Sequence, residues 1–311
     1  MKAITADTRR GASNGQTSRR EARRAQAQSA ARQRRLVIFA GTAIVLVLGV
    51  LVGVSLATSG SSATPASGPA SASVVDAVTR VDQSMFDLIA RGTAAQLPTP
   101  VRGQPAVGSN SLPVVTYIGA EYCPFCAGER WPLIVALSRF GTFSGLQLSH
   151  SASDDIYPNT PTFSFVGSTY TSPYLEFDPV ELQSNVRSGN SYQQLQTPTP
   201  AQTSLLQTYD RPPYVPASAA GSIPFIDIGD QYLVSGASYD IGTLRGMTPD
   251  QVATTLSNPS SSQAQAIVGA ANTLTAAICT STGNMPADVC SAPAVASLQA
   301  TLAATPAPAR G

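Results

Sequence analysis

The sequence predicts an α/β domain preceded by one transmembrane helix. Three observations support this class. An apolar, β-branched run at 113–118 has the composition of a buried strand, and a Cys-Pro-Phe-Cys motif and a helical pattern follow it. Further strand and helix patterns follow along the chain. The segment 36–57 is uncharged and long enough to cross a bilayer.

The start of the chain is strongly basic. Residues 1–35 hold Lys2 and nine arginines against two acidic residues, a net charge of +8, whereas the remainder has a net charge of −7. Such a tail is usually solvated and disordered. An Arg-rich tail can bind nucleic acid, but this one abuts a hydrophobic segment, and positive charge beside such a segment stays on the cytoplasmic side. We therefore expect a disordered cytoplasmic tail and no nucleic-acid partner.

The hydrophobic segment 36–57 predicts a single-pass anchor in the lipid bilayer. A helix of these 22 residues spans about 33 Å, which matches a hydrocarbon core of about 30 Å. The apolar core of a secretory signal peptide is shorter, about 7–15 residues. Cleavage after Ala57 is the alternative, because the last three residues of the segment form an acceptable cleavage site. The prediction is a cell-membrane protein with a cytoplasmic N-terminus and an extracytoplasmic main domain.

Beyond the anchor, we expect a flexible linker and one domain. Residues 58–73 consist of Ser, Ala, Gly, Thr and Pro, a composition that cannot build a core. The domain is predicted over 74–304, with a helical C-terminal extension, and 305–311 form a loose tail. Apolar residues at three- and four-residue spacing predict a first helix at 74–90.

The middle of the domain alternates between strand and helix signals. The strand at 113–118 precedes a helix at 123–140, which Pro132 should kink or divide. A second strand is predicted at 146–150, and an aromatic, strand-rich stretch at 162–177.

The last part of the domain begins with a polar segment, 179–216, whose clustered prolines predict a partly helical insertion. A hairpin with a Gly-Asp turn is predicted at 222–234. Pro249 occupies the first position of a short helix, and an Ala-rich helix follows at 260–279.

All four cysteines follow the anchor, and their even number suggests two pairs in a compartment that permits disulfides. Cys123 is expected at a helix N-terminus, where unpaired N–H groups and the helix dipole favour a thiolate. Cys126, one turn on, is placed to resolve a mixed disulfide. The spacing therefore predicts a redox pair. The alternatives are a purely structural disulfide and a zinc site, but there is no second Cys-x-x-Cys and His150 is the only histidine.

The second pair, Cys279 and Cys290, is predicted to form a structural disulfide. A bond that closes this loop adds about 2–3 kcal/mol in the chain-entropy model. The alternative is a relay, in which the pair passes electrons to or from Cys126.

The order strand, Cys-x-x-Cys, helix, strand, followed by Ile-Pro, a hairpin and a helix, resembles the thioredoxin fold over residues 112–258. The Ala-Glu-Tyr-Cys run is similar to the Ala-Glu-aromatic-Cys of thioredoxins, and Cys-Pro-Phe-Cys resembles glutaredoxin and disulfide-oxidoreductase motifs. The resemblance implies a thioredoxin-like central mixed sheet with flanking helices and a cis-proline at Pro224. The residues that it implies are Cys123, Cys126 and Pro224 for catalysis, and Phe125, Trp131 and Ile223 for substrate docking. For Trp131, the alternative is a place in the core or at its rim.

The longer string YIGAEYCPFCAGERW is similar to an uncharacterised domain-of-unknown-function family of membrane-anchored thioredoxin-like proteins. One departure concerns Tyr117. Thioredoxins usually carry a buried acid at this place, six residues before the first cysteine, and it accepts the proton of the resolving thiol. Glu121 and Glu129, acting through water, are the candidate replacements.

The predicted function is a membrane-anchored, extracytoplasmic thiol–disulfide oxidoreductase that acts on cysteines of exported proteins and is reset by a membrane redox partner. No cofactor and no metal is predicted, since a copper-handling domain would need a nearby His or Met and His150 is alone. The alternative is a non-catalytic binding or scaffold module of the cell envelope with a structural Cys-x-x-Cys. The missing acid and the insertion at 179–216 favour that alternative.

Overall fold

The computed structural model describes residues 67–101, 108 and 110–308. These residues belong to one compact unit, Ala63–Gly311. The predicted basic tail, the predicted transmembrane helix and most of the predicted linker lie outside the described residues. Within the described part of the chain, no helix is both long and apolar enough to cross a membrane.

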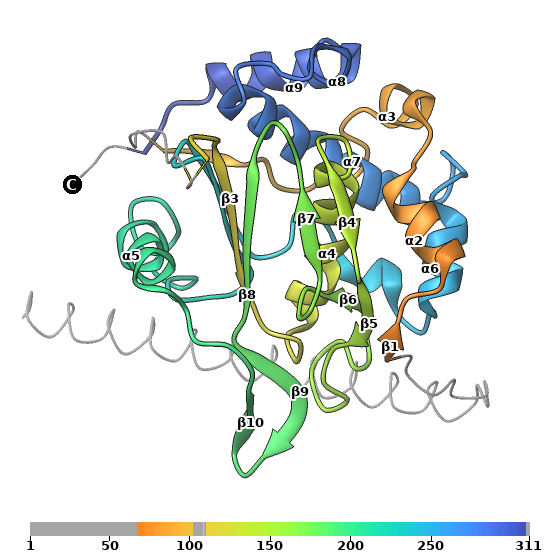
Figure 1. Ribbon diagram of the computed structural model, residues 1–311, viewed down its shortest axis with the longest axis vertical. Coiled ribbons are helices and arrows are strands. Elements are labelled where there is room, and N and C mark those ends of the chain that lie inside the picture. Colours follow the sequence, from red (N-terminus) through yellow and green to blue (C-terminus); the bar gives the residue numbers. More distant parts are fainter. Residues whose placement is uncertain (1–66, 102–107, 109, 309–311) are drawn as a thin grey trace, which may run out of the picture. The chain divides into compact units, whose positions relative to one another are not determined.

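A five-stranded mixed sheet forms the centre of the domain (Figure 1). In spatial order, its strands are β2 (Thr99–Pro100), β12 (Tyr232–Ser235), β11 (Phe225–Ile228), β3 (Val114–Gly119) and β8 (Glu176–Glu181). β3 runs parallel to β8, and the other neighbours are antiparallel. The prediction of an α/β architecture with a mixed sheet and flanking helices is confirmed.

The register of this sheet brings distant segments to the carboxyl end of β3. Gly119, the last residue of β3, pairs with Glu181 of β8, and Ile118 pairs with Phe225 of β11. Phe225 directly follows Pro224, and the Cys-x-x-Cys motif begins four residues after Gly119. The sheet therefore holds Glu181 and Pro224 on either side of the chain that leads into the motif.

Helices cover both faces of the sheet (Figure 1). On one face, α4 (Pro124–Leu137) packs against α7 (Ser262–Ser281). On the other lies α5 (Pro200–Tyr209). Shorter helices pack around α4 and α7: α2 (Ala72–Thr79), α3 (Gln83–Ile89), η1 (Ile241–Leu244), α6 (Pro249–Thr255), α8 (Ala287–Cys290) and α9 (Pro293–Ala304).

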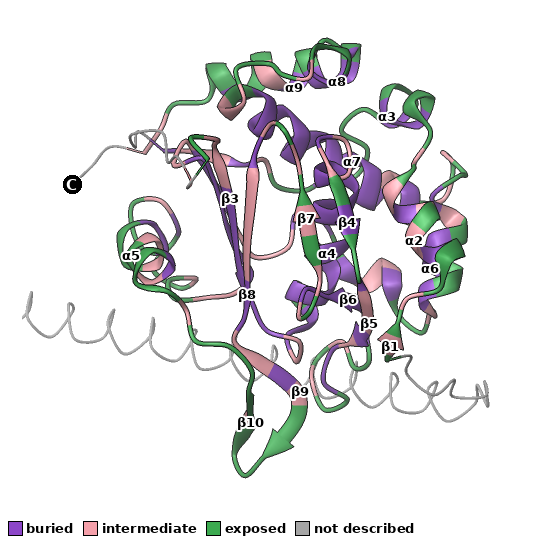
Figure 2. Ribbon diagram, viewed as in Figure 1, coloured by how far each residue is buried: buried purple, intermediate pink, exposed green. Residues whose placement is uncertain are grey.

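Two apolar cores lie on the two faces of the sheet, because successive side chains of a strand point in opposite directions. Tyr117 and Ile226 belong to the core under α4 and α7, whereas Ile118 and Phe225 belong to the core under α5. Figure 2 shows that α4 and α7 are buried over most of their length. The helix that carries the Cys-x-x-Cys motif is therefore an internal element of the domain.

In the described part of the chain, three small sheets lie outside the central one. They consist of β1 (Gly68–Pro69), β5 (Gln147–His150) and β6 (Pro161–Ser164), of β4 (Thr142–Ser144) and β7 (Thr169–Thr171), and of β9 (Gln183–Ser188) and β10 (Ser191–Gln194). The strand predicted at 146–150 is β5, so it pairs outside the central sheet, and β8 lies beside β3 instead. The insertion predicted at 179–216 contributes the β9–β10 hairpin as well as α5.

Local capping changes two predicted boundaries near the start of the domain. Ser71 accepts a hydrogen bond from the Val74 N–H and starts α2 inside the segment predicted to be a linker. The single helix predicted over 74–90 is two helices, because Asp82 accepts a hydrogen bond from the Ser84 N–H and starts α3. Each cap supplies an acceptor for an otherwise unpaired N–H of the first turn.

Pro132 does not divide α4. A proline has no N–H, so the carbonyl of Gly128, four residues earlier, lacks its helical donor. The Tyr239 hydroxyl donates to this oxygen at 2.9 Å and satisfies it. A tertiary contact therefore lets the helix continue through the proline.

The buried side of α7 provides a test of this packing. Leu274 is fully buried, and we expect Leu274→Ala to lower the free energy of unfolding by about 2–5 kcal/mol, because it leaves a cavity. Leu88 on α3 is 68% exposed, and Leu88→Ala, the matched control, should change it by less than about 0.5 kcal/mol. Denaturant unfolding followed by circular dichroism measures both. Equal losses would contradict the described core.

Candidate functional site

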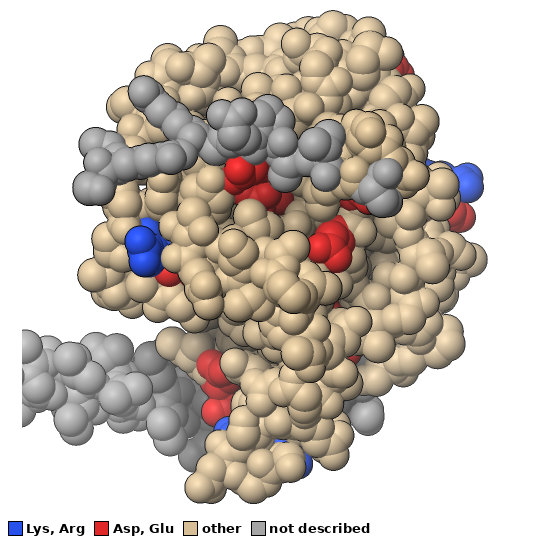
Figure 3. Space-filling model, turned by 60° about the vertical axis from the view of Figure 1, so that its left-hand side comes forward, with Lys and Arg blue, Asp and Glu red and all other residues tan. Residues whose placement is uncertain are grey.

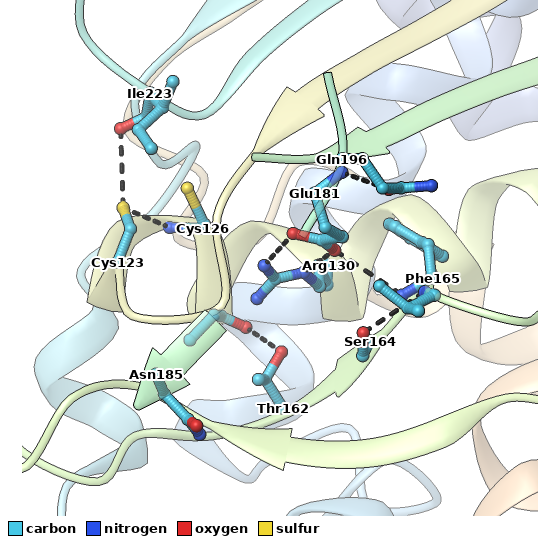
Figure 4. Close-up of polar contacts among 12 residues, drawn as sticks. Cys123, Cys126, Arg130, Thr162, Ser164, Phe165, Glu181, Asn185, Gln196 and Ile223 are labelled. Atoms are coloured by element: carbon cyan, nitrogen blue, oxygen red, sulfur yellow. Dashed lines mark hydrogen bonds and ion pairs between the residues drawn. The ribbon is translucent and has the colours of Figure 1, made fainter. Parts of the chain in front are cut away.

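Cys123 and Cys126 open α4, just after the chain leaves β3 (Figure 4). Cys123 is the N-cap residue, and its Sγ accepts a hydrogen bond from the Cys126 N–H at 3.2 Å. Pro124 occupies the first turn, where an N–H would have no helical partner in any case. One sulfur thus lies at the positive end of the helix dipole and the other in the first turn.

The two thiols differ in acidity. The pKa of Cys123 is lowered, mainly by the hydrogen bond from the Cys126 thiol and further by the Cys126 N–H and the charge of Arg130. The pKa of Cys126 is raised well above its usual value, mainly because burial disfavours the thiolate and then because its thiol bonds to Cys123. The pair therefore combines a thiolate-prone outer sulfur with a protonated inner one, as an attacking and a resolving cysteine require.

Ile223 and Pro224 lie against the outer sulfur. Their peptide bond is cis, and the Ile223 carbonyl oxygen is 3.6 Å from the Cys123 Sγ (Figure 4). Pro224 is buried and Ile223 is partly exposed. Phe125 is 41% exposed and packs edge-on against Tyr157. Two of the residues predicted to dock a substrate, Phe125 and Ile223, therefore reach the surface.

The docking role predicted for Trp131 is wrong. Its side chain is completely buried, its indole N–H donates to the Pro161 carbonyl oxygen at 2.9 Å, and its ring packs edge-on against Phe163. A residue enclosed in this way has no face for a substrate. Trp131 instead fastens α4 to β6, which corresponds to the alternative interpretation of a core residue.

His150 is the last residue of β5, and its Nδ1 lies 2.9 Å from the Ser151 carbonyl oxygen. Its own carbonyl oxygen accepts a hydrogen bond from the Asn185 side chain at 2.9 Å. Among the residues that the structure describes, no group of three or more His, Cys, Asp or Glu side chains could hold a metal ion.

The acids suggested as proton acceptors have other surroundings. Both carboxylate oxygens of Glu129 accept hydrogen bonds from Ser238, each at 2.7 Å, and burial raises the Glu129 pKa to about 7. Glu121 is partly exposed, and its N–H donates to the Gln183 carbonyl oxygen. Tyr117 is completely buried, and its hydroxyl has no hydrogen-bond partner among the described residues.

A buried ion pair next to the motif was missed in the sequence. Nε and Nη2 of Arg130 donate to Oε1 and Oε2 of Glu181 at 2.8 and 2.6 Å, and both side chains are completely buried (Figure 4). The Glu181 N–H in turn donates to Gln196 at 2.7 Å. The only sequence signal was a charged residue inside an apolar helix. Its partner is 51 residues away and arrives through the β3–β8 register.

A cavity of about 660 Å³ lies between the central sheet and α5. Its lining includes Asp178, Tyr209 and Asp227, and burial raises the pKa of Asp227 to about 7. Figure 3, which brings the α5 side forward, shows acidic side chains exposed on a surface that is mostly uncharged. None of the four cysteines lines this cavity, so it is separate from the thiol site.

A disulfide joins Cys279 of α7 to Cys290 of α8, with the Cα atoms 5.6 Å apart. Both residues belong to the core under α4 and α7. The bond therefore links the long buried helix to the C-terminal helices.

Removing this bond distinguishes a structural role from an electron relay. We expect Cys279→Ser/Cys290→Ser to lower the free energy of unfolding by about 2–3 kcal/mol, because the bond restricts the unfolded chain. Denaturant unfolding of the oxidised proteins measures the loss. The reaction of Cys123 with oxidised glutathione should keep its wild-type rate. A slower reaction in the folded variant would support the relay.

The buried ion pair also makes a testable contribution to stability. We expect Glu181→Gln to lower the free energy of unfolding by about 3–5 kcal/mol, because it leaves the Arg130 charge buried without a partner. Arg130→Met/Glu181→Gln, which removes both charges, should recover most of this loss. Asp76→Asn, in the exposed Asp76–Arg80 pair, is the control and should have little effect. Similar losses in the two single variants would contradict a desolvated pair.

The part of the chain that forms this site matches a known protein family. A family model described as a domain of unknown function, DUF929, matches residues 104–280, which include β3, the Cys-x-x-Cys motif, β8 and the Ile-Pro step before β11. No curated protein and no solved structure gives a significant match to the chain. Because the family model covers more than half of the 311 residues, the chain belongs to the DUF929 family.

Proposed function

We propose that this protein is a thiol–disulfide oxidoreductase that acts on cysteines of exported proteins outside the cell membrane. The unequal thiol pair carries the proposal. Cys123, at the N-cap of α4, has a lowered pKa, and Cys126, one turn away, has a raised one. A disulfide kept only for stability does not need this difference, whereas an exchange reaction depends on it.

The geometry supports a two-step exchange. The Cys123 sulfur forms a mixed disulfide with a substrate cysteine, and Cys126 lies one helical turn away to displace the substrate. The Ile223 carbonyl oxygen, 3.6 Å from the Cys123 Sγ, supplies a backbone acceptor beside the reacting atom. An extended substrate segment can pair with such an edge through its own N–H groups.

Exposed apolar side chains on the domain suit an unfolded substrate. Phe125 is 41% exposed, and Ile156 is 67% exposed. Tyr157, which follows Ile156 in the sequence, packs edge-on against Phe125. Exported polypeptides that have not yet folded present extended backbone and apolar side chains, which complement such exposed apolar residues.

We infer a thioredoxin-like fold for the domain. Four observations support it: the parallel β3–α4–β8 unit, the antiparallel β11–β12 hairpin, the strand order β8-β3-β11-β12, and α7 packed beside α4. The cis Ile223–Pro224 bond directly before β11 also matches the expected position.

The membrane topology belongs to the proposal and rests on the sequence. The basic segment 1–35 and the uncharged segment 36–57 favour a tether with a cytoplasmic N-terminus. A tether would keep the domain close to a membrane redox partner that resets the thiol pair after each exchange.

The alternative is a non-catalytic binding or scaffold module, and one observation favours it. Cys123 is only 5% exposed, so a substrate sulfur needs a local opening of the surrounding residues to reach it. The two functions differ in the acidity and the potential that they require of the pair.

The pH dependence of alkylation tests the acidity. We expect Cys126→Ala to raise the pKa of Cys123, because it removes the thiol that contributes most to the lowering. Cys126→Ser keeps a hydroxyl donor and is the matched control. Iodoacetamide is allowed to react with the reduced full-length chain, and mass spectrometry follows Cys123. Because only the thiolate reacts, the rate rises at lower pH in the wild type than in Cys126→Ala.

The equilibrium of the pair with glutathione tests the function. We expect a reduction potential of about −120 to −200 mV, the range of disulfide donors and isomerases. Cys279→Ser/Cys290→Ser is measured in parallel, so that the second disulfide does not contribute. A potential below about −300 mV, together with a Cys123 pKa at or above that of a free thiol, would overturn the proposal in favour of the scaffold module.

A further inference from the structure

The cavity between the central sheet and α5 is acidic. Among the described residues, four carboxylates line it and no Lys, Arg or His does. The acids are Glu176, Asp178, Asp227 and Asp230. The volume of about 660 Å³ is that of a small-molecule site. A hollow whose charges are all of one sign attracts ligands of the opposite charge, so this one suits a small cation.

The register of the sheet arranges two of these acids in a row. Thr116 of β3 pairs with Asp227 of β11 on one side and with Asp178 of β8 on the other. In each strand, a residue two positions away belongs to the core under α5, and side chains two apart share a face, so all three face α5. Neighbouring strands lie about 4.8 Å apart, so the Cα atoms of the two aspartates are about 10 Å apart.

Asp227 has one oxygen without a partner. The residue lines the cavity and is only 1% exposed. Its Oδ2 accepts the Asp230 N–H at 3.0 Å across the hairpin turn, whereas its Oδ1 has no hydrogen-bond partner among the described residues. An asparagine could accept the same bond, so the turn does not account for an acid here. A buried carboxylate oxygen without a donor lowers stability, which a ligand that supplies the donor would offset.

The other acids differ from Asp227 in their contacts. Glu176 accepts the Asn110 N–H at 2.7 Å, and Asp230 is hydrogen-bonded to the Tyr209 side chain. These two carboxylates therefore have partners within the protein.

The remaining acid, Asp178, is partly exposed, so it lies nearer the solvent than Asp227 does. Between the two lies Thr116, and α5 contributes the apolar side chains of Ala201 and Leu205 to the cavity. The cavity thus combines two separated carboxylates with an apolar wall.

We propose that this cavity binds a small organic diamine, with one ammonium group on the Oδ1 of Asp227 and the other on Asp178. An ammonium group donates up to three hydrogen bonds and supplies the charge that offsets a buried carboxylate. The aliphatic part of the ligand packs against Ala201 and Leu205 of α5. A metal ion does not fit, because no group of the described residues could hold one. The cavity contains no cysteine, so the inference does not rest on the proposed exchange function.

Calorimetric titration of the full-length chain with putrescine, a linear diamine, tests the proposal at pH 8 and physiological ionic strength. We expect Asp227→Asn, which keeps an acceptor for the Asp230 N–H, to weaken binding roughly ten- to a hundredfold, because a hydrogen bond between charged groups is lost. Asp178→Asn should weaken it by a smaller factor, because water screens this partly exposed group. Asp76→Asn, on the exposed surface of α2, is the control and should not change it.

Two further readouts separate this site from general attraction of cations. Butylamine, which has one ammonium group, should bind at least about tenfold more weakly than putrescine. Burial raises the pKa of Asp227 to about 7, so this carboxyl is neutral at lower pH while the amine stays charged. The other titratable groups that line the cavity are Glu176 and Asp178 of β8, Tyr209 of α5 and Asp230 of the turn. Putrescine binding should weaken roughly tenfold from pH 8 to pH 6 in the wild type and not in Asp227→Asn.

Three results overturn the inference: a wild type that does not bind putrescine, wild-type affinity in a folded Asp227→Asn, or equal affinity for butylamine. If Asp227→Asn does not fold, Asp178→Asn decides, and wild-type affinity there overturns the inference. The reaction of Cys123 with oxidised glutathione, measured in the same variants, should keep its wild-type rate. Failure of the diamine site therefore leaves the exchange function standing, and failure of the exchange leaves the diamine site standing.

Discussion

The ion pair between Arg130 and Glu181 is the contact on which the arrangement around the thiols depends. It joins α4, which carries both cysteines, to β8, the strand beside β3, through two hydrogen bonds in a region without solvent. A single charge left in such a place is strongly destabilising, so neither element can move away from the other at low cost. The Gly119–Glu181 register and the position of α4 are therefore coupled.

The same charge acts differently on the two sulfurs because their burial differs. Arg130 favours the thiolate of both Cys123 and Cys126. At Cys123, hydrogen bonds from Cys126 exceed the effect of burial, so the pKa falls. At Cys126, burial is the largest effect, so the pKa rises despite the cation. One turn of helix, between a position near the surface and an internal one, is therefore enough to give the two thiols opposite pKa shifts.

Short-range contacts hold the first half of α4 on several sides. The Gly128 carbonyl accepts the Tyr239 hydroxyl, and the Trp131 indole donates to the Pro161 carbonyl, each at 2.9 Å, while Arg130 binds β8. These three contacts come from one turn of the helix, directly after the motif. They fix the direction of the helix start, and hence of both sulfurs.

Local patterns were enough to predict the strand before the motif, the helix that starts at Cys123 and the β11–β12 hairpin, because an apolar run, an N-cap and a Gly-Asp turn are encoded within a few residues. Long-range pairing was not encoded in this way. The β3–β8 register, which supplies Glu181 to Arg130, joins segments separated by a long connection, and burial of Trp131 depends on β6 packing over it. The sequence thus singled out the thiol pair as the candidate site. Only the tertiary structure decided their acidity and partners, because desolvation and electrostatics depend on what the rest of the chain brings alongside.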